Sequence, residues 1–218
     1  FYVDMKTPGI EAKPIKQISG SANFNEVFFN DVRIPDSQRI GAEGDGWKVS
    51  LTTLMNERLA VGDPPGLDFD QIFEASKEIE VEDGLAVKNS EVRQKMADWY
   101  IQSRGLQYTK YRSMTALSKG QTPGPELSIS KLVTASKMQD VSSYALDLMD
   151  MSGMVHQDQN PILKNLFQNG YFFSAAMRIA GGTDEVLRNI IAERVLGLPQ
   201  DERSDKKLPF NELPSGKN

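Results

Sequence analysis

The stretch MRIAGGTDEVLRNIIAERVLGLP, residues 177–199, carries the most specific local pattern in the chain. Gly181 and Gly182 permit a sharp turn and a close approach of the backbone to a ligand, because glycine has no Cβ atom. Thr183 follows as a candidate helix cap, at a place where the first amide groups of a helix face outward toward an anion or a polar edge. We therefore predict a ligand-facing turn and a helix over residues 183–196, although the same residues also fit an ordinary capped turn.

Upstream of this stretch, apolar residues recur at spacings of three and four, which is typical of amphipathic helices. The first such helix begins after Gly44, and its Trp47, Leu51 and Leu54 are expected to form one buried face. Further helices are predicted up to about residue 79, from a cap at Ser90 to the turn at 120–124, and over 128–149 and 161–176. The fold class is mainly α: an up-and-down helical bundle.

The first forty residues have a different character. Proline and glycine punctuate short β-type runs such as residues 26–29 and 32–34, which predicts sheet and turns. We divide the chain into a β-domain remnant at 1–43, a helical bundle at 44–199 and a tail rich in proline and charge at 200–218. Because Phe1 opens directly on an alternating segment, we expect the chain to be a piece of a longer protein.

Composition excludes several kinds of site. The chain has no cysteine and one histidine, so disulfides, thiolate nucleophiles and Cys- or His-rich metal sites are excluded. Its net charge is −5 with both signs interspersed, which does not provide the basic surface that nucleic-acid binding needs. No run of eighteen apolar residues is present, so no membrane span is predicted. The lack of cysteine indicates a cytoplasmic location.

Two segments resemble the acyl-CoA dehydrogenase family. Residues 177–199 are similar to its terminal signature, a Gly-Thr turn that opens the last helix of a bundle. Residues 7–10 (TPGI), 24–35 (FNEVFFNDVRIP), Gly41, 46–47 (GW) and 56–58 (NER) are similar, in order, to the family's passage from its middle β-domain into its first C-terminal helix. The resemblance implies the end of a truncated β-barrel domain followed by the C-terminal helical domain.

The resemblance also implies a reaction. A base removes the α-proton of an acyl-CoA thioester while the β-hydrogen leaves as hydride to FAD, and an electron-transfer flavoprotein then takes the electrons. In many members the base is a glutamate just before the Gly-Thr, but this chain has Gly181 there. A branch similar to isovaleryl-CoA dehydrogenase carries its glutamate in a Glu-Arg-Leu sequence on the first C-terminal helix, which makes Glu57 the candidate base; the alternative is a solvated surface glutamate.

The remaining site residues follow from the same resemblance. Arg58 is expected to bind the phosphates or adenine of CoA, unless it is a surface ion-pair partner, because a guanidinium offers a fork of donors to phosphate. The Gly181 N–H is expected to polarise the thioester carbonyl, and Gly182, Thr183 and Glu185 to lie against FAD. At least a dimer, homomeric or heteromeric, is implied.

Two departures from the family pattern favour an alternative function. An Arg-x-x-Phe-Gly motif that reaches the flavin of a neighbouring subunit is replaced by the acidic run 80–84, and a glycine-rich loop is reduced to Gly153. Some bacterial members that act on bulky sterol or lipid-derived acyl-CoAs form mixed tetramers with incomplete flavin sites. The chain is therefore either a catalytic dehydrogenase or a half-site or non-catalytic subunit, and a flavin hydroxylase or nitroalkane oxidase on the same fold stays open by analogy.

Overall fold

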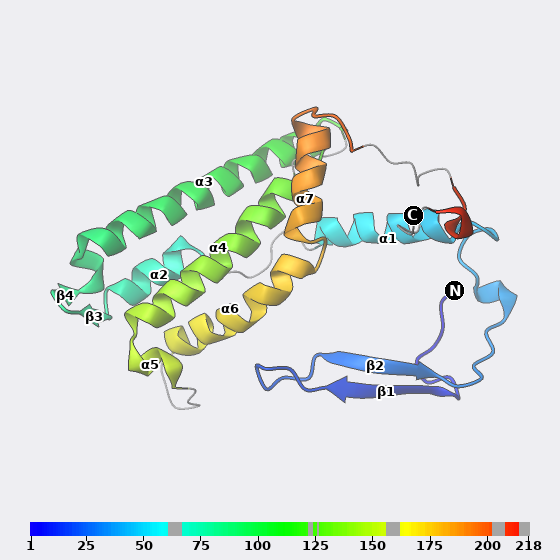
Figure 1. Cartoon of the computed structure of the whole chain (residues 1–218), viewed down its shortest axis with the longest axis horizontal. Coiled ribbons are helices and arrows are strands. Elements are labelled where there is room, and N and C mark those ends of the chain that lie inside the picture. Colours follow the sequence, from blue (N-terminus) through cyan, green and yellow to red (C-terminus); the bar gives the residue numbers. More distant parts are fainter. Residues whose placement is uncertain (61–66, 122–123, 126, 156–161, 202–207, 214–218) are drawn as a thin grey trace.

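A computed structural model describes residues 1–60, 67–121, 124–125, 127–155, 162–201 and 208–213 (Figure 1). Its N-terminal part is an antiparallel hairpin of β1 (Ile10–Ile15) and β2 (Phe24–Phe29), in which Ile10 pairs with Phe29 and Ile15 with Phe24. Residues 32–34, predicted as β, are not a strand. A short 3-10 turn, η1 (Asp36–Gln38), follows the hairpin, which lies apart from the main group of helices in Figure 1.

Helix α1 (Gly46–Ala60) forms where predicted, but the prediction that its apolar face is buried is wrong. Trp47 is 77% exposed and Leu54 50% exposed, and Leu51 is exposed as well. The spacing identified an apolar face correctly. Among the described residues, however, no helix or strand packs extensively on α1, so that face stays in contact with solvent.

The bundle is built from α2 (Phe69–Ser76), α3 (Ser90–Ser118), α4 (Leu127–Leu148) and α6 (Ile162–Ile179). Figure 1 shows the chain running along α3, back along α4 and forward again along α6, and α4 packs against both neighbours. The predicted mainly helical, up-and-down bundle is thus confirmed. One buried residue of each helix illustrates the core: Ile72, Trp99, Val141 and Phe167. Gly170 of α6 approaches α4 closely, because a Cβ there would collide with Leu67 and Ser142.

Shorter elements connect these helices. The acidic run after α2 forms a tight hairpin of β3 (Glu80–Val81) and β4 (Gly84–Leu85), followed by the 3-10 turn η2 (Ala86–Lys88). Helix α3 is capped by Asn89 rather than by the predicted Ser90: the Asn89 carboxamide oxygen accepts from the Glu91 and Val92 amides. Asparagine and serine are equally good caps, so the sequence alone could not choose between adjacent candidates.

The C-terminal part contains α5 (Met151–Met154), α7 (Asp184–Ile190) and η5 (Phe210–Glu212). The single helix predicted for 183–196 is divided: α7 ends at Ile190, and η3 (Ile191–Val195) continues as a wider π turn in which the Leu196 amide donates to the Ile191 carbonyl. None of the helices in the described ranges combines the length and apolar character that a membrane crossing requires.

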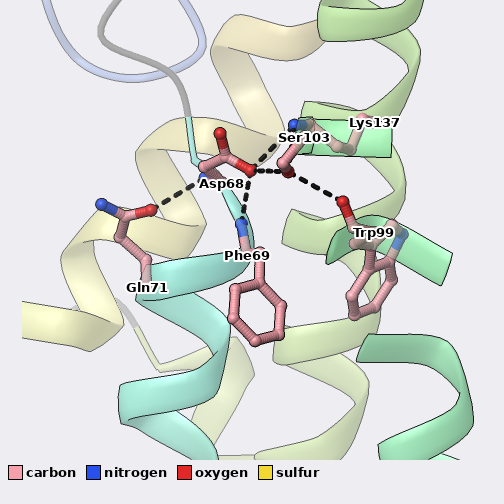
Figure 2. A network of polar contacts seen from close by, with 6 residues as sticks. All are labelled: Asp68, Phe69, Gln71, Trp99, Ser103 and Lys137. Atoms are coloured by element: carbon pink, nitrogen blue, oxygen red, sulfur yellow. Dashed lines mark hydrogen bonds and ion pairs between the residues drawn. The ribbon is translucent and has the colours of Figure 1, made fainter. Parts of the chain in front are cut away.

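A polar network ties α2 to α3 and α4 (Figure 2). The Lys137 ammonium donates to the Asp68 carboxylate and to the Ser103 hydroxyl, each at 2.8 Å, and Ser103 also contacts Asp68. Asp68 is the N-cap of α2, where it accepts from the Phe69 amide while its own amide donates to the Gln71 side chain. The Lys137 side chain is almost completely buried, so its charge depends on these partners.

Candidate functional site

The turn between α6 and α7 has the geometry that the sequence predicted. Gly181 has φ +68° and Gly182 φ +103°, values that disfavour a residue with a Cβ. Thr183 caps α7, and its hydroxyl accepts from the Val186 amide at 3.3 Å. The backbone amides of Gly181, Gly182 and Thr183 donate to no group in the described part of the chain. Successive backbone amides without a protein partner are donors that suit an electron-rich group.

Lys131 of α4 holds this turn from the bundle side. Its ammonium donates to the Gly182 carbonyl at 2.6 Å and lies 3.9 Å from one carboxylate oxygen of Asp184. Burial lowers the pKa of the Lys131 ammonium, and the nearby Asp184 charge opposes this shift only in part. A partly buried cation therefore lies at the carbonyl oxygen of the peptide group that joins Gly182 to Thr183.

Arg178, near the end of α6, provides a second attachment. Its Nε donates to the other oxygen of Asp184 at 2.6 Å, and a terminal guanidinium nitrogen donates to the Gln139 side chain of α4 at 2.7 Å. Asp184 is 3% exposed, and its oxygen nearest Lys131 has no hydrogen-bond partner among the described residues. The first residue of α7 is thus anchored between two cations, which fixes the orientation of the turn.

The structure describes the surroundings of four of the predicted site residues but not the side chains of the other two. Gly181, Gly182 and Thr183 form the turn and Glu185 lies in the first turn of α7; Gly181 and Glu185 are exposed and the other two are half-buried. Helix α1 includes Glu57 in its last turn, but the side chains of Glu57 and Arg58 lie outside the described residues. The roles of these two side chains stay predictions.

Sequence reasoning missed the three side chains that fix the turn: Lys131, Arg178 and Asp184. Arg178 and Asp184 flank the glycines, and opposite charges six residues apart across a turn were a usable signal. Lys131 gave none, because its partner is 51 residues away in sequence. In the described ranges no group of three or more carboxylate, histidine or cysteine side chains is arranged to hold a metal ion.

Comparison with known proteins agrees with this architecture. Residues 44–196 match the family model "Acyl-CoA dehydrogenase, C-terminal domain". A match over this much of the chain decides the family: the chain belongs to the acyl-CoA dehydrogenases, an oxidoreductase family, as the resemblance predicted.

Curated relatives cover most of the chain. Acyl-CoA dehydrogenase IpdE1 of Mycobacterium tuberculosis is 34% identical over 93% of this chain and 51% of its own length. Acyl-CoA dehydrogenase FadE34 of the same organism is 31% identical over 92% of this chain and 26% of its own length. The chain therefore spans about half of the first relative and a smaller share of the second.

Solved structures with the same fold are more distant in sequence. The ChsE4-ChsE5 complex from Mycobacterium tuberculosis superposes with a TM-score of 0.72 at 19% identity, over 91% of this chain and 52% of that one. The "Tcur3481-Tcur3483 steroid ACAD" gives a TM-score of 0.74 at 21% identity, over 91% and 51% of the two chains. These likenesses establish the fold.

Proposed function

We propose that this chain is the C-terminal part of an FAD-dependent acyl-CoA dehydrogenase that removes the α-proton and β-hydride of an acyl-CoA thioester. The observation that carries the proposal is the glycine turn at 181–183, with three backbone amides that have no described partner. Carbonyl oxygens, such as that of a thioester or of a flavin ring, are the acceptors that such amides fit. The residues present therefore fit the cofactor that family membership implies.

Each residue of the turn has a proposed task. The Gly181 amide donates to the thioester carbonyl, which acidifies the α-proton by stabilising the charge that develops on that oxygen. The space beside Gly181 is open, since a Cβ built there would meet nothing within 4 Å. Gly182, Thr183 and Glu185 face the cofactor, and FAD, when bound, supplies the hydride acceptor.

The proposed base is Glu57, and Arg58 binds the CoA phosphates. A carboxylate in an apolar site has a raised pKa and so becomes an effective base near neutral pH. Glu57 lies on α1 and not in the turn sequence, so Gly181 is proposed to act through its backbone amide alone. An electron-transfer flavoprotein is the proposed acceptor of the electrons.

The test uses the full natural protein in which this sequence occurs. Its visible absorption is recorded before and after a panel of acyl-CoAs is added, and we expect a flavin spectrum that bleaches with a substrate. Glu57→Gln should retain flavin but bleach about a hundredfold more slowly. Glu74→Gln is the matched control: Glu74 is an exposed α2 residue paired with Lys77 at 2.6 Å, and its loss should leave the rate unchanged. A protein that stays colourless after FAD is added contradicts the proposal.

A second candidate is a half-site subunit of a heteromeric dehydrogenase. The exposed apolar face of α1 favours it, and the similar structures include the ChsE4-ChsE5 complex and a steroid ACAD. On this reading the substrate class is a bulky, steroid-like acyl-CoA. The protein alone would then be colourless and would gain a flavin spectrum only when co-expressed with its partner, whereas a catalytic homo-oligomer is coloured by itself.

A further inference from the structure

The ammonium of Lys131 contacts a backbone carbonyl of the turn more closely than it contacts a carboxylate. The short contact of Lys131 is to the Gly182 carbonyl, at 2.6 Å, and the Asp184 carboxylate is more distant at 3.9 Å. The Lys131 side chain is 15% exposed, so solvent screens its charge only partly. Lys131 therefore directs a partly desolvated positive charge onto one peptide group.

The same peptide group contains the N–H of Thr183, which has no partner among the described residues. The Gly182 carbonyl and the Thr183 N–H belong to the same planar unit, so a cation that accepts electron density from the carbonyl oxygen makes the N–H a stronger donor. The Thr183 amide has no partner in the described part of the chain, and its donor capacity is available to a ligand. Arg178 and Asp184 keep the turn in place but do not touch this peptide unit through any described hydrogen bond.

We propose that Lys131 is a positioning residue that strengthens the Thr183 amide as a donor to the flavin, and that it thereby stabilises the reduced, more negative flavin over the oxidised form. This inference rests on the proposed function, since it assigns Lys131 a task toward the cofactor of that site. Lys131 acts through the Gly182–Thr183 peptide and does not itself contact the cofactor.

Lys137 provides a matched control on the same helix. It lies six positions further along α4, it is also a buried donor, and its acceptors are Asp68 and Ser103 rather than the turn. Lys131→Met and Lys137→Met both delete an ammonium and keep an unbranched side chain. Any general loosening of α4 appears in both variants, whereas an effect on the turn appears only in the first.

The experiment measures two properties of the flavin-loaded full protein, or of its heteromeric assembly: the FAD dissociation constant and the midpoint potential of bound FAD. For Lys131→Met we expect a dissociation constant about tenfold higher, the loss of roughly one charge-assisted interaction, and a more negative midpoint potential. Lys131→Arg, which keeps the charge, should restore both values most of the way. Lys137→Met should change neither, although it lowers the melting temperature.

The results separate the failure of this inference from that of the proposed function. An unchanged potential in Lys131→Met, or an equal shift in Lys137→Met, overturns the inference while the dehydrogenase assignment stands. A wild-type protein that binds no FAD in any assembly overturns both.

Discussion

The Lys137 ammonium of α4 donates to the Asp68 carboxylate at 2.8 Å, although the two residues are 69 positions apart in sequence. Figure 2 shows both side chains meeting Ser103 of α3, so that one contact point joins three helices. The two partners differ in burial: the Lys137 side chain is 2% exposed and that of Asp68 47%. This asymmetry has consequences for stability.

Removing the carboxylate should cost more stability than removing the lysine. Asp68→Ala leaves the buried Lys137 charge with Ser103 as its one remaining partner in the described part of the chain and also deletes the α2 cap, a combined loss of about 3 kcal/mol. Lys137→Met leaves Asp68 accessible to water, for about 1 kcal/mol. Urea unfolding of the two variants measures the difference. Equal losses, or a larger loss for Lys137→Met, would show that the network does not depend on burial of the lysine.

The same pair predicts an acid dependence. Burial raises the pKa of the Asp68 carboxyl, but hydrogen bonds from Lys137, Ser103 and the Phe69 amide together outweigh it and hold the pKa below its ordinary value of 3.8. A carboxyl whose pKa is lower in the folded state stabilises the fold above its unfolded pKa. The stability from Asp68 is therefore complete above about pH 5 and is lost as the pH falls below about 4.

Melting temperatures between pH 7 and pH 3 measure this effect. Wild type should approach Asp68→Asn as the pH falls, because both then carry an uncharged side chain at this position. A constant gap between the two proteins over this range would rule out the ionised carboxylate as the source of the stability.

Replacing the two glycines of the turn by alanine should lower the stability by different amounts, because their φ angles differ. Gly181→Ala should destabilise by about 1 kcal/mol, because alanine tolerates its φ of +68° poorly although nothing lies near the added Cβ. Gly182→Ala, at φ +103°, should cost more. Gly105→Ala is the opposite control: Gly105 lies inside α3 in open space, and alanine should stabilise by about 0.5 to 1 kcal/mol. Thermal unfolding ranks the three, and any other order contradicts this account of the turn.

Arg178 should not be replaceable by lysine. Its guanidinium serves two acceptors in different directions, Asp184 through Nε and Gln139 through a terminal nitrogen. An ammonium lacks this planar fork. Both Arg178→Lys and Arg178→Met should lower the free energy of unfolding, the second by about 2 kcal/mol. Each substitution weakens or removes the hydrogen bond that Arg178 donates to the buried Asp184 carboxylate. Full stability of Arg178→Lys in urea unfolding would show that charge alone is sufficient.

The sequence predicted the helices where local signals agree. Apolar periodicity, the turn at 120–124 and the cap region near Ser90 placed α3 and α4 closely, and Gly181-Gly182-Thr183 identified the turn with left-handed glycines. Periodicity reports that a helix has an apolar face but not whether anything covers that face. For this reason α1 was located correctly while the burial of Trp47 was not.

The approximate positions of the helices and the glycine turn before α7 were thus determined by the sequence itself, since both depend on interactions within a few residues along the chain. Only the tertiary structure decided which side chains hold the turn and the bundle together. Lys131 reaches Gly182, and Lys137 reaches Asp68, because antiparallel packing of α4 against its neighbours brings distant residues within hydrogen-bonding distance. Two lysines on one helix look alike in sequence, and their different tasks arise from the groups that the fold places opposite them.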